Sequence, residues 1–283
     1  MAHEGADFDS VQAAIDSIPS GSSTRIRIDI GAGTYIEKLV IENRRNLCLV
    51  GASAESTVLG YDDANATIGS TSGSASVHVS ADDFSAANLT IQNSYGSGSQ
   101  AVALRTTGDR QQFLGCRFVG YQDTLYTHSG TQYFRDCYVQ GNVDYVFGGA
   151  TAILQDCEVR NVEAGSAVAA PNTDASVPYG IIFLGGEFTA VASISQDSVA
   201  LGRPWGAAGA AAYLNVTLGA HISSAGFVMM SGNDPLNARF REHESSGPGA
   251  NPAAHATYQM DGSEAADYTV ENVFSSWVPS YSE

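Results

Sequence analysis

A short phrase occurs twice between residues 113 and 148, and each copy is followed by an aspartate at the same distance. Residues 113–116 read FLGC and residues 134–137 read FRDC. Asp123 lies seven residues after the first cysteine, and Asp144 lies seven residues after the second. If the two copies fold into stacked, equivalent units, the two aspartates are neighbours.

Three further segments extend this repeat along the chain. They read FSAANL at 84–89, LQDCEV at 154–159 and FLGGEF at 183–188. When the five copies are aligned, the cysteine position is occupied by Ala87, Cys116, Cys137, Cys157 and Gly186. The intervals between these residues are 29, 21, 20 and 29. A period near 20 residues built from short strands predicts an all-β solenoid, with loops inserted in the longer intervals. A β-sandwich with regularly spaced strands is the competing fold.

The region before these repeats also reads as short strands. Apolar segments alternate with Gly, Ser, Asn and Asp, and they read IRIDI, LVI, LCLV, TVLG, VHVS and NLTI. One amphipathic helix is predicted over residues 9–18, with Val11, Ala14, Ile15 and Ile18 on one face and Pro19 after it. A single helix before an all-β body predicts a cap over an exposed sheet end.

Composition and charge exclude several classes of protein. Hydrophobic residues make up 43% of the 283-residue chain and charged residues 15%, which is typical of an ordered protein. The net charge of −17 with only 13 basic residues argues against nucleic acid binding. No apolar run approaches the roughly 18 residues of a membrane helix, so no membrane association is expected.

The four cysteines allow two interpretations. Cys48, Cys116, Cys137 and Cys157 show no CxxC and no metal-ligand spacing, and the last three occupy the repeat position. One interpretation is a stack of small apolar residues inside the solenoid. The other is a disulfide between Cys137 and Cys157, since strands about 4.8 Å apart lie within the Cα separation that a disulfide tolerates.

The stacked aspartates suggest acid–base chemistry. Two carboxyl groups roughly 5 Å apart in a partly dry groove cannot both ionise easily, so one keeps its proton and the other acts as a base or nucleophile. The alternative is a pair of solvated turn residues. Nearby aromatic residues favour a sugar site: Tyr121, Tyr126, Tyr145 and Phe147. The sequence has no G-x-S-x-G motif and therefore no evident serine nucleophile.

Five phrases, in order, resemble the pectin methylesterases, or pectinesterases. They are GTYIEK from Gly33, QAVAL from Gln100, GYQDTLY from Gly120, VDYVFG from Val143 and LGRPW from Leu201. Members of this family are carbohydrate esterases with a right-handed parallel β-helix fold. The resemblance implies one catalytic domain over residues 1–283 that hydrolyses methyl esters of galacturonate in pectin, without a metal or an organic cofactor.

The resemblance also implies a role for each polar residue of these motifs. Asp144 corresponds to the nucleophile, and Asp123 to the general acid that later serves as base. Gln100 and Gln122 correspond to the amides that stabilise the oxyanion, and Arg203 to the partner that keeps Asp144 ionised. Without the resemblance, Gln100 would be read as a strand-edge amide and Arg203 as part of a surface ion pair.

Four aromatic residues match positions that line the substrate cleft in the family: Trp205, Tyr126, Tyr145 and Phe84. Their rings would pack on sugar rings, and ordinary core packing is the alternative. The chain departs from the family at 225–230, where AGFVMM replaces a Gly-Trp segment, and at 170–172, where APN replaces Gln-Gly-Arg. These departures leave the preferred methylation pattern open.

Pectin, as methylated homogalacturonan, is thus the expected partner of a monomeric enzyme secreted to the cell wall. Glycosylation sequons at Asn65, Asn88 and Asn215 are compatible with secretion. The competing functions are a polygalacturonase or pectate lyase on the same fold, and a solenoid that binds polysaccharide without catalysis. The strong negative charge predicts weak retention of the demethylated, anionic product.

Overall fold

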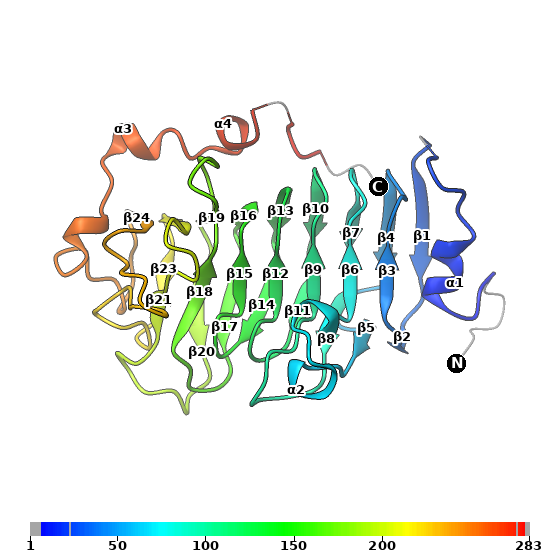
Figure 1. Ribbon diagram of the computed structural model, residues 1–283, viewed down its shortest axis with the longest axis horizontal. Coiled ribbons are helices and arrows are strands. Elements are labelled where there is room, and N and C mark those ends of the chain that lie inside the picture. The colour runs from blue at the N-terminus through cyan, green and yellow to red at the C-terminus, as the bar shows by residue number, and fades with distance from the viewer. Residues whose placement is uncertain (1–6, 23, 276, 281–283) are drawn as a thin grey trace.

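The computed structural model describes residues 7–22, 24–275 and 277–280. In these ranges the strands form three parallel sheets that run the length of an elongated molecule (Figure 1). Each turn of the chain adds one strand to each sheet in succession. The fold is therefore a parallel β-helix, which confirms the predicted class, and the parallel pairing excludes a β-sandwich.

The sheets are named A, B and C here. Sheet A contains β1 (Ile26–Ile30), β4 (Leu47–Gly51), β7 (Ser85–Ala87), β10 (Gln111–Leu114), β13 (Thr131–Arg135), β16 (Thr151–Gln155), β19 (Ile181–Leu184), β22 (Ala210–Leu214) and β24 (Arg239–His243). Sheet B contains β2 (Gly33–Ile36), β5 (Thr57–Tyr61), β8 (Thr90–Asn93), β11 (Arg117–Val119), β14 (Tyr138–Gly141), β17 (Glu158–Asn161), β20 (Glu187–Ala190) and β23 (Thr217–Leu218). Sheet C contains β3 (Leu39–Ile41), β6 (Val77–Val79), β9 (Leu104–Thr106), β12 (Leu125–Thr127), β15 (Val146–Gly148), β18 (Ala167–Pro171) and β21 (Ala200–Gly202).

The corner between sheets A and B explains why the repeat has its composition. One residue in each of six coils has a left-handed backbone, with φ between 51° and 68°: Asn88, Gly115, Asp136, Asp156, Gly185 and Asn215. Asn, Asp and Gly tolerate this conformation best. The corner turns the next residue into the core, which is why a cysteine or another small or apolar residue follows.

The register corrects one of the five predicted copies. The strands of the later copies, at 134–139, 154–159 and 183–188, pair in the register that the sequence alignment predicts. Phe134 lies opposite Phe113 and Leu154, and Leu154 lies opposite Phe183. In the first copy, however, Phe113 pairs with Ala86 rather than with Phe84. Leu89, not Ala87, therefore takes the cysteine position, and the alignment was wrong by two residues.

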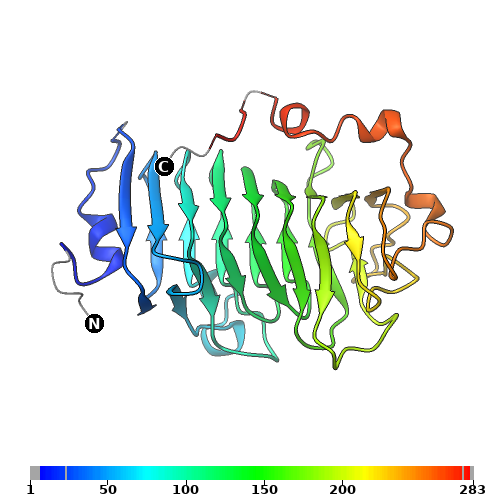
Figure 2. The same ribbon diagram turned by 180° about the vertical axis from the view of Figure 1, so that it is seen from behind.

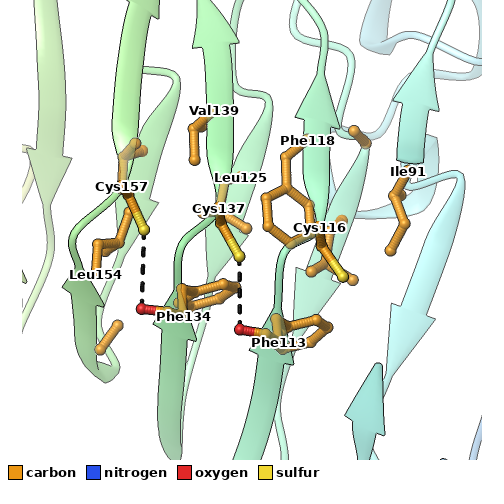
Figure 3. Close-up of a cluster of buried hydrophobic side chains, with 14 of the residues drawn as sticks. Ile91, Phe113, Cys116, Phe118, Leu125, Phe134, Cys137, Val139, Leu154 and Cys157 are labelled. Atoms are coloured by element: carbon orange, nitrogen blue, oxygen red, sulfur yellow. Dashed lines mark hydrogen bonds between the residues drawn. The ribbon is translucent and has the colours of Figure 1, made fainter. Parts of the chain in front are cut away.

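The core contains ladders of stacked side chains (Figure 3). The rings of Phe113 and Phe134 stack with centroids 4.8 Å apart, and the edge of Phe118 meets Phe134 at 5.5 Å. All four cysteines are buried, and Cys116, Cys137 and Cys157 are free thiols. The Sγ atoms of Cys137 and Cys157 each point to a carbonyl oxygen of the preceding coil, at 3.5 and 3.8 Å. The interior stack is thus confirmed, and the proposed disulfide is absent.

The predicted helical cap is present as α1 (Val11–Asp16), shorter than the predicted range. Val11 and Ile15 are buried in the same core as the first strands. The carboxylate of Glu37 accepts hydrogen bonds from the first two helical amides at 2.9 and 3.1 Å, where a negative charge suits the helix dipole.

Short helices elsewhere were not predicted from the sequence. They are α2 (Asn65–Ile68), η1 (Ser72–Ser74), η2 (Ala256–Tyr258), α3 (Gly262–Ala265) and α4 (Val270–Phe274). Each has at most five residues, too few to show a helical period. None of the helices in the described ranges is long and apolar enough to cross a membrane.

A segment that we call the C-terminal strap, residues 262–275 and 277–280, runs back along the top of the solenoid (Figures 1 and 2). Its Val273 and Phe274 are buried against the outer face of sheet A, where they join a second hydrophobic cluster with Ile153 and Ile182. The ring of Phe274 also meets Tyr133 of β13, at 6.4 Å. The strap thus connects strands from β22 back to β13.

The stacked core predicts the effect of a cavity. Phe134→Ala should lower the free energy of unfolding by about 3–5 kcal/mol, because a fully buried ring between two others leaves a void. Arg135→Ala, the next residue on the same strand with a side chain 55% exposed, is the control and should change stability little. Denaturant unfolding followed by tryptophan fluorescence measures both. A Phe134→Ala loss no larger than that of the control would contradict the packing described.

Candidate active site

The two repeated aspartates lie on neighbouring coils, each just before a strand of sheet C. Leu125 pairs with Val146, so Asp123 and Asp144 occupy equivalent places. Both have left-handed backbones, with φ of 65° and 50°, which aspartate tolerates better than most residues. The peptide N–H of Asp123 donates to the carbonyl of Val143 at 3.0 Å, so parallel pairing continues through this corner.

Arg203 holds Asp144 in a bidentate ion pair. Its Nε donates to Oδ1 at 2.8 Å and its Nη2 to Oδ2 at 2.6 Å. The Asp144 side chain is 6% exposed and that of Arg203 is 22% exposed, so water screens the pair poorly. The hydrogen bonding of Arg203 to Asp144 raises the pKa of Arg203, which keeps the guanidinium charged. The two parallel hydrogen bonds therefore fix the orientation of the Asp144 carboxyl group.

Asp123 is buried beside this pair and has a different charge state. Burial, and then the negative charge of Asp144, raise the pKa of Asp123 to about 8, against the opposing effect of Arg203. A single cation cannot compensate two buried carboxylates, and it is bonded to Asp144. At neutral pH Asp123 keeps its proton, so the site offers a carboxylate next to a proton donor.

A cleft with a volume of about 550 Å³ opens over the two acids. Its lining includes all five polar residues singled out from the sequence: Gln100, Gln122, Asp123, Asp144 and Arg203. The coils of the two glutamines are adjacent, since the N–H of Ala101 donates to the carbonyl of Gln122 at 3.1 Å. The solenoid thus gathers residues from four separate motifs.

An aromatic surface lies beside the acids. The rings of Tyr126 and Phe147 stack with centroids 4.1 Å apart, and Trp205 lies 6.3 and 5.9 Å from them. All three line the cleft, and Trp205 is 39% exposed. Ring faces of this kind pack well on the apolar faces of sugars.

Two of the four aromatic assignments are wrong. Phe84 is 1% exposed and its ring lies 5.8 Å from Phe113 in the core. Tyr145 is fully buried, and its hydroxyl donates to Asn161 Oδ1 at 2.9 Å inside the solenoid. Tyr145 packs in the same core cluster as the next residue, Val146, although it directly follows Asp144 of the cleft. Both therefore belong to the core and not to the cleft.

One wall of the cleft was missed. Ser70, Thr71 and Ser72 line it from the loop between β5 and β6, residues 62–76. The Nζ of Lys38 holds this loop through Asp63 and the carbonyl of Gly73, both at 2.6 Å. The unusual length of this connection was the available sequence signal.

The departures from the family alter the opposite wall. Met230 lines the cleft, whereas Phe227 stacks on Phe240 in the core with centroids 4.4 Å apart. Asn233 connects the two sides of this wall, because its Nδ2 donates to the Trp205 carbonyl at 2.9 Å and its backbone pairs with Met230. Ala170, from the second departure, leaves a short side chain in the lining.

No group of three or more His, Cys, Asp or Glu side chains that could hold a metal ion occurs in the ranges that the structure describes.

The buried acid pair in an open cleft of the parallel β-helix indicates an enzyme site for acid–base chemistry. A sequence profile of the pectinesterase family matches residues 1–276. Pectinesterase 31 of Arabidopsis thaliana is 37% identical over 257 residues, which cover 86% of this chain and 80% of that protein. The chain belongs to the pectinesterase family.

Solved structures agree with this assignment. The pectin methylesterase from carrot has a TM-score of 0.91 and 30% identity, covering 97% of this chain and 92% of that one. A variant of a pectin methylesterase in complex with a hexasaccharide has a TM-score of 0.89 and 30% identity, covering 99% and 96%.

The raised pKa of Asp123 predicts a pH-dependent term in stability. Between about pH 4 and pH 8 the folded chain keeps a proton on Asp123 that the unfolded chain releases, so this residue lowers stability as pH rises through that range. Asp123→Asn should remove the term. As pH rises from about 4 to 8, the free energy of unfolding of the variant should increase relative to that of wild type, by at most about 1.4 kcal/mol per pH unit. Above about pH 8 this difference should increase no further.

Denaturant unfolding at a series of pH values measures this difference. Asp136→Asn makes the same chemical change at a side chain that is 56% exposed, and its profile should stay parallel to that of wild type. Parallel profiles for Asp123→Asn as well would show that Asp123 is not protonated in the folded chain.

Proposed function

We propose that the chain hydrolyses methyl esters of galacturonate residues in pectin through a covalent intermediate on Asp144. One observation carries the proposal: a carboxylate fixed by Arg203 lies beside a buried acid that keeps its proton, in an open cleft with an aromatic side. An ester needs a nucleophile at its carbonyl carbon and a proton for its leaving alcohol, and these two residues supply them.

The first half of the reaction forms the intermediate. A carboxylate oxygen of Asp144 attacks the ester carbonyl carbon, and the negative charge moves to the carbonyl oxygen. The amides of Gln100 and Gln122, which line the same cleft, donate hydrogen bonds to that oxygen. The tetrahedral centre then collapses, the bond to the methoxy oxygen breaks, and Asp123 gives its proton to the departing methanol. The galacturonate carbonyl is left attached to Asp144 as an anhydride.

The second half restores the enzyme. Asp123, now a carboxylate, takes a proton from water while the water oxygen attacks the galacturonate carbonyl carbon. The anhydride bond breaks, Asp144 returns to its ion pair with Arg203, and the free galacturonic acid loses its proton to solvent. The sum is one ester and one water converted to methanol, a carboxylate and a proton.

Arg203 has two effects in this scheme. Its charge keeps Asp144 ionised, and its two parallel hydrogen bonds fix the plane of the attacking carboxylate. It also leaves Asp123 without a cation of its own, so that the proton stays where the leaving group needs it.

The remaining parts of the proposal concern the whole protein. We infer one catalytic domain over residues 1–283, acting as a monomer outside the cell on methylated homogalacturonan without a metal or an organic cofactor. Two sequons support an extracellular location, because Asn88 and Asn215 are exposed at corner positions, while Asn65 is half-buried.

The nucleophile assignment predicts loss of turnover without loss of fold. Asp144→Asn should lower kcat by on the order of 10⁴-fold or more, because an amide cannot form the intermediate. Methanol release and acid titration with methylated pectin measure the rate, and Asp136→Asn is the matched control. Near-normal turnover in Asp144→Asn would exclude the mechanism. Chain shortening or unsaturated ends without methanol would show a polygalacturonase or a lyase instead, and binding without any turnover a non-catalytic solenoid.

The oxyanion assignment predicts a different kinetic pattern. Gln122→Ala should lower kcat by about 10²–10³-fold while KM changes little, because the hydrogen bond forms only as charge develops on the carbonyl oxygen. Gln92→Ala on sheet B, which removes an amide outside the cleft lining, is the control. A change confined to KM would show that Gln122 binds the ground state rather than the transition state.

A further inference from the structure

The floor of the cleft continues beyond the acid pair along sheet C. The register places the following outward-facing residues in one row, one per coil: Val40, His78, Arg105, Tyr126, Phe147 and Ala170. The last three line the cleft over the acids. Arg105 is the next residue in the row on the N-terminal side, one coil from Tyr126. A polymer that leaves the cleft along the row in that direction passes over it.

The guanidinium of Arg105 lacks the partners that other arginines have. It lies 5.9 Å from the ring centroid of Tyr126, and its Nε is buried without a hydrogen-bond partner among the described residues. Arg110 shows the contrast, since its Nη2 donates to Asp83 at 3.0 Å. Arg105 is partly exposed and forms no salt bridge among the described residues, so its positive charge is available to an anionic ligand.

Two histidines lie on either side of Arg105. Burial and then the charge of Arg105 lower the pKa of both His78 and His128. His78 also contacts Thr107 Oγ1 through Nε2 at 3.3 Å, which fixes its ring on this face. Glu42 acts on His78 in the opposite sense. The lowered pKa values leave both imidazoles uncharged at neutral pH, so the positive charge on this face is that of Arg105, on a chain of net charge −17.

We propose that Arg105, flanked by His78 and His128, is an anion subsite that binds the free carboxylate of a galacturonate unit in the polymer whose ester lies over Asp123 and Asp144. The identity of the polymer rests on the proposed function. A guanidinium offers paired donors that match a carboxylate, whereas a methyl ester is neutral and binds them weakly.

This subsite changes the expectation drawn from net charge. The negative surface repels a demethylated polymer at long range, but that repulsion is screened by salt beyond about 10 Å. Arg105 acts at contact, where screening is weak. The subsite therefore holds a chain that already carries a carboxylate on this side, and hydrolysis is directed to esters next to units that have lost theirs.

The test compares binding of two oligogalacturonides, one fully methylated and one unesterified, by calorimetry, with every variant made in the Asp144→Asn background so that the methylated oligomer is not hydrolysed. Arg105→Gln should weaken binding of the unesterified oligomer by about tenfold and leave the methylated oligomer within twofold. Arg105→Lys should restore part of the loss. Arg117→Gln is the matched control, because Arg117 also lies over a tyrosine ring, that of Tyr138 at 4.1 Å, but on sheet B away from the cleft. It should leave both affinities unchanged, and thermal unfolding midpoints verify that all variants are folded.

Several results would overturn the subsite. They are equal weakening of both oligomers by Arg105→Gln, no weakening of either, or the same effect from Arg117→Gln. Inorganic phosphate at the same ionic strength tests for a general anion site: displacement of the unesterified oligomer by phosphate as effectively as by a second oligogalacturonide would also overturn it.

The subsite and the proposed function are tested by separate measurements, one of binding and one of methanol release. If wild type releases no methanol but Arg105→Gln still weakens the unesterified oligomer selectively, the proposed function is wrong and the subsite stands. If wild type releases methanol and the selective weakening is absent, the subsite is wrong and the proposed function stands.

Discussion

Parallel pairing in strict register is the constraint on which the rest of this structure depends. Each coil can bond to the next only if equivalent residues lie about 4.8 Å apart, so any feature repeated in the sequence becomes a line in space. The aromatic ladder, the cysteine stack and the left-handed corner residues all follow from it. So does the approach of Asp123 to Asp144, which no local structure would bring together.

The acid pair shows how the same constraint produces reactivity. Stacking alone would give two equivalent buried carboxyls, each unfavourable when ionised. Arg203, supplied by a coil further along the chain, breaks the equivalence because its fork can satisfy only one of them. The difference between Asp144 and Asp123 is therefore not a property of either corner. It arises from the position of one cation relative to two identical backbones.

Sequence was sufficient where a residue's role follows from the repeat, and insufficient where it follows from side-chain direction or from loops. The solenoid, the helical cap and the stacking of the two acids were predictable from periodicity, whereas Gln100, Gln122 and Arg203 were predictable only through the resemblance of their motifs to a known family. Phe84 and Tyr145 were misassigned because a residue type near a site does not reveal which way the side chain points. The first copy of the repeat was misaligned because Phe84 was matched to Phe113 by residue type. In the structure Ala86 lies opposite Phe113, and the two rings contact each other from positions that are not equivalent. Ser70 to Ser72 lie on an inserted loop, whose path no period describes.

The C-terminal strap has a consequence for how the molecule unfolds. A solenoid without long-range connections is nearly one-dimensional: each coil contacts only its neighbours, and the ends can fray while the middle stays ordered. Here the last part of the chain returns over sheet A and packs on strands contributed by several earlier coils. Loss of a terminal coil therefore also uncovers apolar side chains in the middle of the stack. This joins the coil that carries Asp144 to the coils at the C-terminal end in one cooperative unit, so that partial opening at that end is penalised before it reaches the cleft.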